Sequence, residues 1–271
     1  MPSGLFSGFM VGTWVEASIM AAVAGAIGFF VVLRGATFAA HAIPQGAFTG
    51  AAGAALIGAN TLLGVGAFSL AGVVAIARWG KRGRHDVVTA LSLVTLLGVG
   101  SLFLSMSTEY SEQTFSLLFG QPIAVAAADI PPTAAIGAAS VALVVLLYRS
   151  LVLTSVAPEL AAAQGIRPQR IELLFLLAVG AATTMALPVV GALLVFSLMI
   201  GPAAAARFMT SRPAWAMAAS AGLALVTVWV SITASFWSDW PIGFFVGALA
   251  VVWYAVGRIL GHGRGAVGSS Q

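Results

Sequence analysis

Residues 9–33 read F-M-V-G-T-W-V-E-A-S-I-M-A-A-V-A-G-A-I-G-F-F-V-V-L, an apolar run whose single charged side chain is Glu16. A helix needs about 20 apolar residues to cross a hydrocarbon core about 30 Å thick. No basic residue precedes the run, whereas a secretory signal begins with a positively charged region. Residues 9–33 are therefore predicted to form a retained transmembrane helix.

The composition extends this prediction to the rest of the chain. Of 271 residues, 60% are hydrophobic and 7% are charged, against about 25% charged residues in an average soluble domain. We expect an all-α, polytopic transmembrane helical bundle forming one unit over residues 1–271, with its membrane region at 9–257. The chain has no cysteine, which excludes disulfides, thiolate metal sites and cysteine nucleophiles. Its basic residues form no single patch, so no nucleic-acid partner is expected.

Nine spans are predicted, with eight as the alternative count because the sixth and seventh are short and separated only by Pro188. They are Phe9 to Leu33, Ala36 to Ile57, Leu62 to Ala77, Val87 to Met106, Thr133 to Tyr148, Ile171 to Leu187, Val189 to Ala205, Ala214 to Ser235 and Ile242 to Gly257. The apolar segment Phe115 to Ala128 is expected to form a short helix at the outer face, and residues 261–271 a frayed tail.

The distribution of charge sets the orientation. Short cytoplasmic loops are enriched in Lys and Arg. With nine spans and the amino terminus outside, all twelve Lys and Arg residues fall on the inner side, together with the carboxy terminus. The outer loops instead carry acidic and aromatic residues, as in the segment Phe236 to Trp240.

Few ionisable side chains lie within the predicted spans. A charged group at the bilayer centre costs about 2.5–3.5 kcal/mol on insertion scales, so such groups usually face a cavity or a partner. Glu16 and His41 are the candidates. Gln45 follows His41 by four residues, which places both on one face of a helix. Thr183 and Thr184 are further candidates for lining a path, although mid-span threonines commonly bond their own helix carbonyls.

The loop between spans five and six predicts a short cytoplasmic helix. Residues 154–170 read T-S-V-A-P-E-L-A-A-A-Q-G-I-R-P-Q-R. Pro158 suits a first helical turn, Glu159 suits the positive end of the helix dipole, and Gly165 suits the helix end. On this pattern alone the helix is either an ordered connector or a docking element.

The run A-P-E-L-A-A-A-Q-G-I, residues 157–166, resembles the coupling segment of the metal-ion permeases of ATP-binding cassette importers, the zinc and manganese uptake family. Two further stretches, S-L-L-F-G-Q-P-I-A-V (116–125) and V-G-A-L-L-V-F-S-L-M-I-G-P-A-A-A-A-R (190–207), resemble motifs of the same family in the same order. The resemblance implies coupling to an ATPase through Ala157, Pro158, Glu159, Ala161 and Gly165. Ala157 stands where the family usually has an acid.

The resemblance implies a membrane-spanning permease subunit of an importer for divalent metal ions, zinc or manganese, in the plasma membrane. Such a subunit forms a homodimer in the lipid bilayer, with two ATPase subunits and an extracytoplasmic metal-binding protein. It holds no permanent cofactor and binds the transported metal transiently. The sequence has no Gly-x-x-x-x-Gly-Lys-Ser/Thr phosphate loop, so ATP hydrolysis is expected in a separate chain and no enzymatic activity in this one.

The family's second span carries an Asp and a His, four residues apart, that bind the cation. Here His41 stands for the acid and Gln45 for the histidine. Neutral imidazole suits zinc, whereas an amide oxygen is a poor ligand. Three interpretations stay open: the pair lines the cation path together with another polar group, the site has changed, for example for a chelated metal, or His41 is structural.

The G-P step at Gly201 and Pro202 is either a structural kink or a gating hinge near the cytoplasmic mouth. Two other functions were weighed. An intramembrane enzyme would need a nucleophile and base motif that is missing here, and a secondary carrier would normally show more intramembrane charge. Within the importer class, a siderophore or cobalamin-like chelate is the alternative cargo.

Overall fold

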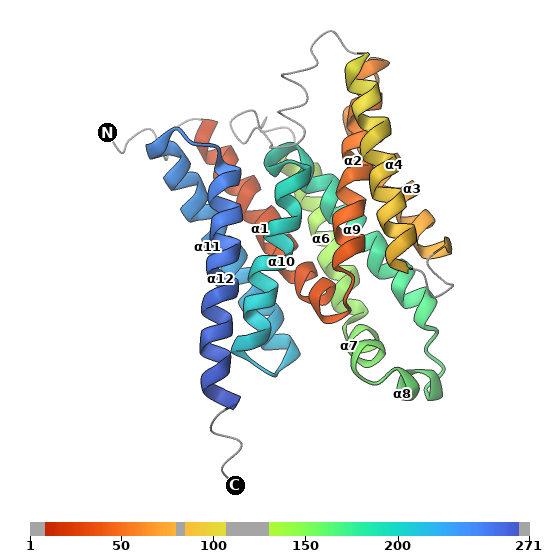
Figure 1. Ribbon diagram of the computed structural model, residues 1–271, viewed down its shortest axis with the longest axis vertical. Helices are drawn as coiled ribbons and strands as arrows, with labels where there is room; N and C mark the ends of the chain where they lie inside the picture. Colours follow the sequence, from red (N-terminus) through yellow and green to blue (C-terminus); the bar gives the residue numbers. More distant parts are fainter. Residues whose placement is uncertain (1–8, 80–84, 107–129, 266–271) are drawn as a thin grey trace.

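The computed structural model describes residues 9–79, 85–106 and 130–265, and the elements assigned within them are α-helices (Figure 1). They are α1 (Phe9–Leu33), α2 (Thr37–Leu56), α3 (Thr61–Trp79), α4 (His85–Ser105), α6 (Ile130–Leu146), α7 (Tyr148–Val156), α8 (Pro158–Ala163), α9 (Pro168–Val190), α10 (Ala192–Met209), α11 (Pro213–Ser238) and α12 (Ile242–Gly265). The predicted all-α bundle is confirmed.

Each predicted span coincides with one long helix, from α1 through α4, then α6 and α9 through α12. Among the described residues, five helices are long and apolar enough to cross a membrane, or six if the bent pair α6 and α7 is one span. The polytopic membrane architecture is therefore confirmed, and the count of nine stays a prediction. In Figure 1, α1 begins at the upper end of the bundle and α12 ends at the lower end.

Helix α2 lies at the centre of one half of the bundle, packed against α3, α4, α9 and α10. Every residue from Ala39 to Ala52 is buried except His41, which is half-buried. Such a helix is surrounded by protein, so it needs no lipid-facing stripe of large apolar side chains. This explains why α2, rich in Gly and Ala, is not among the helices with the strongest hydropathy.

Small residues let α2 approach its neighbour closely. A Cβ on Gly50 would lie 2.1 Å from the carbonyl oxygen of Gly64 in α3, and a Cβ on Gly64 would lie 2.4 Å from the carbonyl oxygen of Gly50. Glycine at both positions therefore brings the two backbones into contact. Close approach through small residues is typical of helix pairs in lipid, where packing replaces the hydrophobic effect as the main attraction.

The boundary between the sixth and seventh predicted spans was placed wrongly. Helix α9 continues through Pro188 to Val190, and the break lies at Gly191, whose φ is 79°. The left-handed region is readily adopted only by glycine. Gly191 therefore ends α9 and starts α10, whereas Pro188 is accommodated in the last turn.

Two other predictions concern segments near the limits of the described residues. Helix α12 extends to Gly265, so the predicted tail from residue 261 begins as helix. The predicted outer helix from Phe115 to Ala128 lies outside the described residues.

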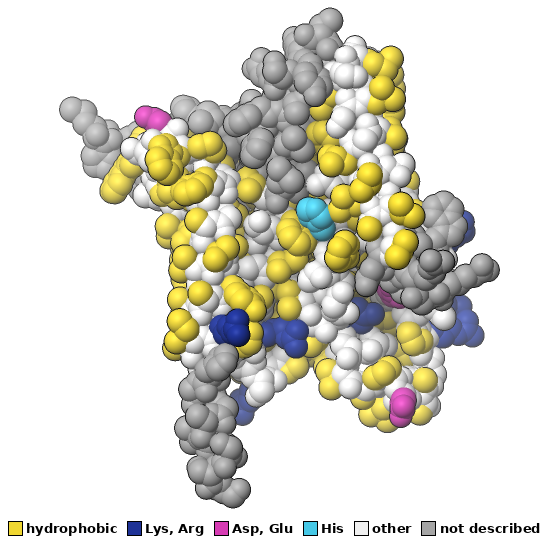
Figure 2. All heavy atoms as spheres, viewed as in Figure 1, with side chains coloured by type: hydrophobic (Ala, Val, Ile, Leu, Met, Phe, Trp, Pro, Cys, Tyr) yellow, Lys and Arg dark blue, Asp and Glu magenta, His cyan; other side chains and the backbone are white. Residues whose placement is uncertain are grey.

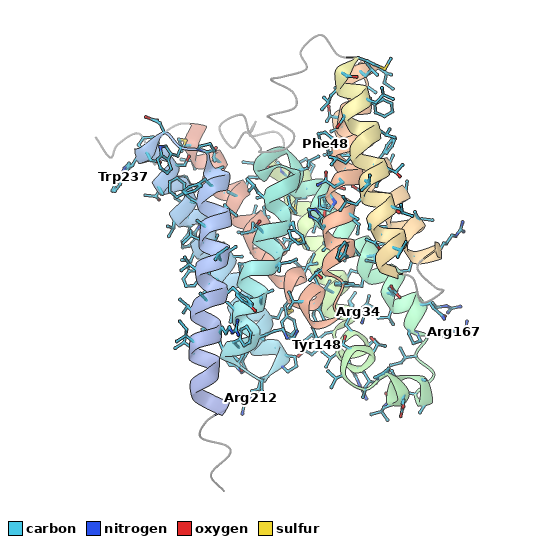
Figure 3. All side chains as sticks on the ribbon, in the orientation of Figure 1. Arg34, Phe48, Tyr148, Arg167, Arg212 and Trp237 are labelled. Carbon is cyan, nitrogen blue, oxygen red and sulfur yellow. The ribbon has the colours of Figure 1, made fainter. Side chains whose placement is uncertain are left out.

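The chain turns sharply after α6. A bend of 56° at the α6–α7 break leads into α7 and then α8, which lie at the lower end of the bundle (Figure 1). Lys and Arg side chains gather mostly in the lower half of the face shown in Figure 2. Figure 3 places Arg34, Arg167 and Arg212 toward this end and Trp237 at the opposite end. The charged end and the aromatic end of the bundle are thus separated as the sequence predicted.

Replacing Gly50 by alanine is expected to destabilise the bundle, because the added methyl group would overlap the Gly64 carbonyl. Overpacking of this kind typically costs about 1–3 kcal/mol. The matched control is Gly66→Ala in α3, where an added Cβ meets no atom within 4 Å. Thermal unfolding in detergent should show a lower midpoint for Gly50→Ala only. Equal midpoints for the two variants would contradict the close α2–α3 contact.

Candidate functional site

Helix α2 carries two buried polar atoms that have no hydrogen-bond partner among the described residues: Nδ1 of His41 and Oε1 of Gln45. The Gln45 side chain is 2% exposed. A buried polar atom without a partner costs about 1–3 kcal/mol, so each such atom in a folded protein needs an explanation. The two atoms lie one helical turn apart on α2, and each can coordinate a cation or accept a hydrogen bond from a polar cargo.

His41 contacts α10 through an aromatic ring. The centroids of the His41 and Phe196 rings are 4.6 Å apart, with an interplanar angle of 65°. Edge-to-face contacts between rings favour one ring orientation. In Figure 2 a histidine side chain is visible among hydrophobic side chains on the face shown. Phe196 was not singled out from the sequence, although it lies inside the 190–207 motif.

Thr49, one helical turn after Gln45, connects the backbone of α2 to that of α4. Its hydroxyl is within hydrogen-bond distance of the carbonyl oxygens of Gln45, at 2.8 Å, and of Leu96 in α4, at 2.5 Å. The residue is fully buried. Thr49 therefore ties the turn of α2 that carries Gln45 to α4, a role that its position in the sequence did not reveal.

Glu16 lies at a different depth from the pair. It is buried in α1 at 2% exposure. At about 1.5 Å per residue, Glu16 is roughly 25 Å along α1 from the end of that helix at Leu33, whereas His41 is roughly 6 Å along α2 from its start at Thr37. Glu16 therefore belongs to another level of the bundle than His41 and Gln45.

Thr183 and Thr184 lie buried in α9, and both hydroxyls donate to carbonyl oxygens of their own helix. Thr183 donates to Val179 at 2.8 Å and Thr184 to Gly180 at 2.9 Å. The hydroxyl hydrogens are used in these bonds, so each threonine can contact a cation only through the lone pairs of its hydroxyl oxygen. Their role in a path stays a prediction.

The donor set at α2 is small and neutral. Among the described residues, no group of three or more His, Cys, Asp or Glu side chains could hold a metal ion. One chain brings one imidazole nitrogen and one amide oxygen to this place, fewer than the four or more ligands of a protein-bound divalent metal. The pair can therefore contribute to a cation site but cannot complete one alone.

The segment predicted as a coupling helix forms α8 with the expected ends. Pro158 is in its first turn, and Gly165 has a φ of 73°. The amide of Gly165 donates to the carbonyl of Ala162, and that of Ile166 to Ala161, both at 3.0 Å, which is the Schellman pattern for a helix end.

Burial divides the residues of α8 into two groups. Ala161 is fully buried, so it anchors α8 to the bundle. The other α8 residues, Pro158, Glu159, Leu160, Ala162 and Ala163, are exposed, as is Gly165 just beyond it. Helix α8 thus presents an exposed face while one small residue holds it in place.

The G-P step in α10 does not interrupt the helix, which continues through Pro202 to Met209. A Cβ on Gly201 would lie 2.5 Å from the Cβ of Ala250 in α12. Gly201 therefore has a packing role between α10 and α12. A hinge at Gly201 and Pro202 stays a prediction.

The sequence and fold are similar to those of several known membrane proteins. The pattern of the ABC 3 transport family matches residues 7–260. The manganese import system permease protein ScaB of Streptococcus pneumoniae is 30% identical over 209 residues, 77% of this chain and 74% of that protein. The chelated iron transport system membrane protein YfeC of Yersinia pestis is 29% identical over 203 residues, 73% of this chain and 68% of that protein. A chain in the structure of PsaBC from Streptococcus pneumoniae in complex with Fab has a TM-score of 0.85 at 22% identity, covering 94% of this chain and 93% of that one.

The Oε1 atom of Gln45 gives a stability prediction. Replacing Gln45 by leucine removes a buried acceptor that has no partner among the described residues, so the unfolding midpoint should stay the same or rise. The contrasting variant is Thr49→Val, which removes the single hydroxyl hydrogen that lies between the carbonyl oxygens of Gln45 and Leu96 and should cost about 1 kcal/mol. Thermal unfolding of both variants in the same detergent checks this. A large loss of stability in Gln45→Leu would show that the amide is a structural group.

Proposed function

The chain belongs to the ABC 3 transport family, and from this premise we propose that it is the membrane-spanning permease subunit of an ATP-binding cassette importer for divalent metal ions, zinc or manganese. The observation that carries the proposal is the pair of unpartnered polar atoms on α2, the most enclosed helix of one half of the bundle. Relatives named for manganese import support this class of cargo.

The proposed path runs along α2. His41 and Gln45 take part in binding the metal during passage, and Phe196 orients the imidazole. Glu16, Thr183 and Thr184 are proposed to line other levels of the path, and Gly201 and Pro202 to act as the hinge near its inner mouth. Binding by neutral donors is weak, which suits transport because a cation must leave the site as well as enter it.

A second permease copy is proposed to complete the site. His41 is the one half-buried residue in the otherwise buried stretch from Ala39 to Ala52. A homodimer that covers this face would bring further ligands to the cation and close the path from lipid. Residues 1–271 act as one permease unit in this assembly, with no resident cofactor.

Two ATPase subunits are proposed to dock on the exposed face of α8, one on each permease copy, and to hydrolyse ATP. An extracytoplasmic metal-binding protein delivers the cargo at the opposite end. This places the chain in the plasma membrane, with its amino terminus outside and its carboxy terminus in the cytoplasm. The arginines at the end of the bundle that carries α8 support this orientation, because basic residues favour the cytoplasmic side.

A chelated metal is the second candidate cargo. The donor set of His41 and Gln45 carries no negative charge, so it stabilises a bare divalent ion less than a carboxylate would. A relative named for chelated iron transport is 29% identical to this chain. A chelate brings its own ligands and needs only hydrogen-bonding or shape contacts from α2.

Uptake into proteoliposomes tests the cargo and the site. The complex reconstituted with its ATPase partner facing the vesicle lumen, and given the metal-binding protein outside, should accumulate Mn²⁺ or Zn²⁺ when ATP is enclosed in the vesicles. His41→Ala and Gln45→Ala should each lower the initial rate by roughly 10-fold, as expected for the loss of a contact of about 1.4 kcal/mol. Leu63→Ala, at an exposed position of α3, is the control and should transport normally.

Unchanged Mn²⁺ and Zn²⁺ uptake in both α2 variants would remove the pair from the path. Uptake of iron supplied as a chelate, without uptake of the free ions, would favour the second cargo.

A further inference from the structure

Arg34, in the turn between α1 and α2, reaches across the bundle to the end of α7. Its Nη1 lies 2.8 Å from Oγ1 of Thr154, and it lies 3.4 Å from both the carbonyl oxygen of Leu151 and Oγ of Ser155. All three partners are in α7, with Thr154 and Ser155 in its last turn, and they are more than a hundred residues away in sequence. Figure 3 shows Arg34 where the α1–α2 turn meets α7.

The guanidinium of Arg34 also interacts with residues of α9. It lies 5.5 Å from the centroid of the Phe175 ring in α9. Partial burial lowers the pKa of Arg34, and the negative charge of Glu172 opposes that shift. An arginine stays charged under these conditions. Its positive charge also suits the carboxy-terminal end of α7, where the helix dipole is negative.

The α1–α2 turn is held from a second helix too. Arg207, near the end of α10, donates from Nη1 to the carbonyl oxygen of Val32 at 3.1 Å. The Phe30 ring packs edge-to-face on Tyr148 at the start of α7, with centroids 5.8 Å apart. The last turn of α1 is thus in contact with both α7 and α10. A movement of α7 relative to the bundle would therefore shift or break these contacts at the α1–α2 turn.

Helices α7 and α8 are joined by one residue. Ala157 has a φ of −140° and a ψ of 70°; its amide donates to Leu153 in α7, and its carbonyl accepts from Ala161 in α8. With a single residue between them and hydrogen bonds on both sides, the two short helices are closely linked. A displacement of α8 therefore displaces the partners of Arg34.

On its other side, Arg34 is followed by Gly35, with a φ of 67°, and then by α2. His41 is seven residues beyond Arg34, about 10 Å along the chain at the helical rise. The chain thus runs from α8 through α7 to Arg34, and from Arg34 directly into the helix that carries the cation site. Each step is a contact or a covalent link.

We propose that Arg34 is the positioning residue that transmits movement of α8 to α2, so that its bond to Thr154 couples ATP hydrolysis to cation passage. The proposal rests on the proposed function, in which α8 is the docking site of the ATPase. Arg34 is not a ligand of the cation in this account. Its role is to keep the start of α2 attached to α7 when the ATPase displaces α8.

The test compares variants in the reconstituted complex by the number of Mn²⁺ ions, with Zn²⁺ in parallel, transported per ATP hydrolysed. Arg34→Met removes the charge at similar length, and Thr154→Val removes the hydroxyl while keeping the shape. Both should lower this ratio about fivefold or more, the lower range of measured coupling between sites. Arg34→Lys and Thr154→Ser keep a donor or an acceptor and should restore part of the ratio.

Two controls separate coupling from folding. The amount of ATPase that co-purifies should stay at the wild-type value in the Arg34 and Thr154 variants, and their unfolding midpoints should fall by no more than the loss of this hydrogen bond implies, about 1 kcal/mol. The double variant Arg34→Met with Thr154→Val should lose no more than either single variant, because both remove the same interaction. Arg212→Lys, at an exposed arginine on the same end of the bundle, should leave the ratio unchanged.

A wild-type ratio in both Arg34→Met and Thr154→Val would overturn the proposal. So would a lower ratio that is also seen in Arg34→Lys and Thr154→Ser, or one that is explained by a matching fall in co-purified ATPase, since Arg34 would then be a structural residue only.

Variants of α8 distinguish this failure from failure of the proposed function. Glu159→Arg and Gly165→Val should impair ATPase docking or coupling. If they do so while the Arg34 variants do not, only the transmission role fails. If the α8 variants couple normally, or the wild-type complex moves neither Mn²⁺ nor Zn²⁺, the proposed function fails and the inference fails with it.

Discussion

The enclosure of α2 by other helices is the constraint on which the rest of the structure depends. A helix that faces lipid must be apolar, because unsatisfied polar groups are costly in hydrocarbon. Helix α2 escapes this rule because α3, α4, α9 and α10 surround it. It can therefore carry His41, Pro44 and Gln45 in one turn and a half, at the cost of needing glycine where its backbone meets α3.

The burial of α2 among other helices determines how His41 and Gln45 are solvated. On an exposed helix His41 and Gln45 would be hydrated, whereas here each keeps a buried atom with no hydrogen-bond partner in the part of the chain that the structure describes. The same enclosure limits how α2 can move. Its carboxy-terminal half is tied to α4 through Thr49, and its amino-terminal end follows a turn held by Arg34 and Arg207. The turn at Arg34 is where α7 contacts the start of α2, whereas α8 packs against α7 and α9.

Much of the fold was predictable from the sequence, because the length of each apolar segment must match the thickness of the bilayer and because Lys and Arg residues lie between these segments. The positions of the long helices, the ends of α8 at Pro158 and Gly165, and the four-residue spacing of His41 and Gln45 are local properties of the chain. The break at Gly191 was missed because Pro188 is the stronger local signal, yet a glycine with positive φ decides where α9 ends. The contacts of Phe196 with His41 and of Arg34 with Thr154 join segments far apart in sequence, and no local pattern could reveal them.

The central claim is that His41 faces a path that opens to alternate sides of the membrane under control of the ATPase. Because the chain has no cysteine, the variant His41→Cys carries a single thiol, whose reaction with a membrane-impermeant thiol reagent can be followed in proteoliposomes. The account predicts that the rate and side of modification change when the ATPase is trapped with ATP and vanadate, whereas Ile57→Cys, at the exposed far end of α2, reacts alike in both states. A thiol at position 41 that reacts identically with and without nucleotide, or that never reacts while position 57 does, would contradict it.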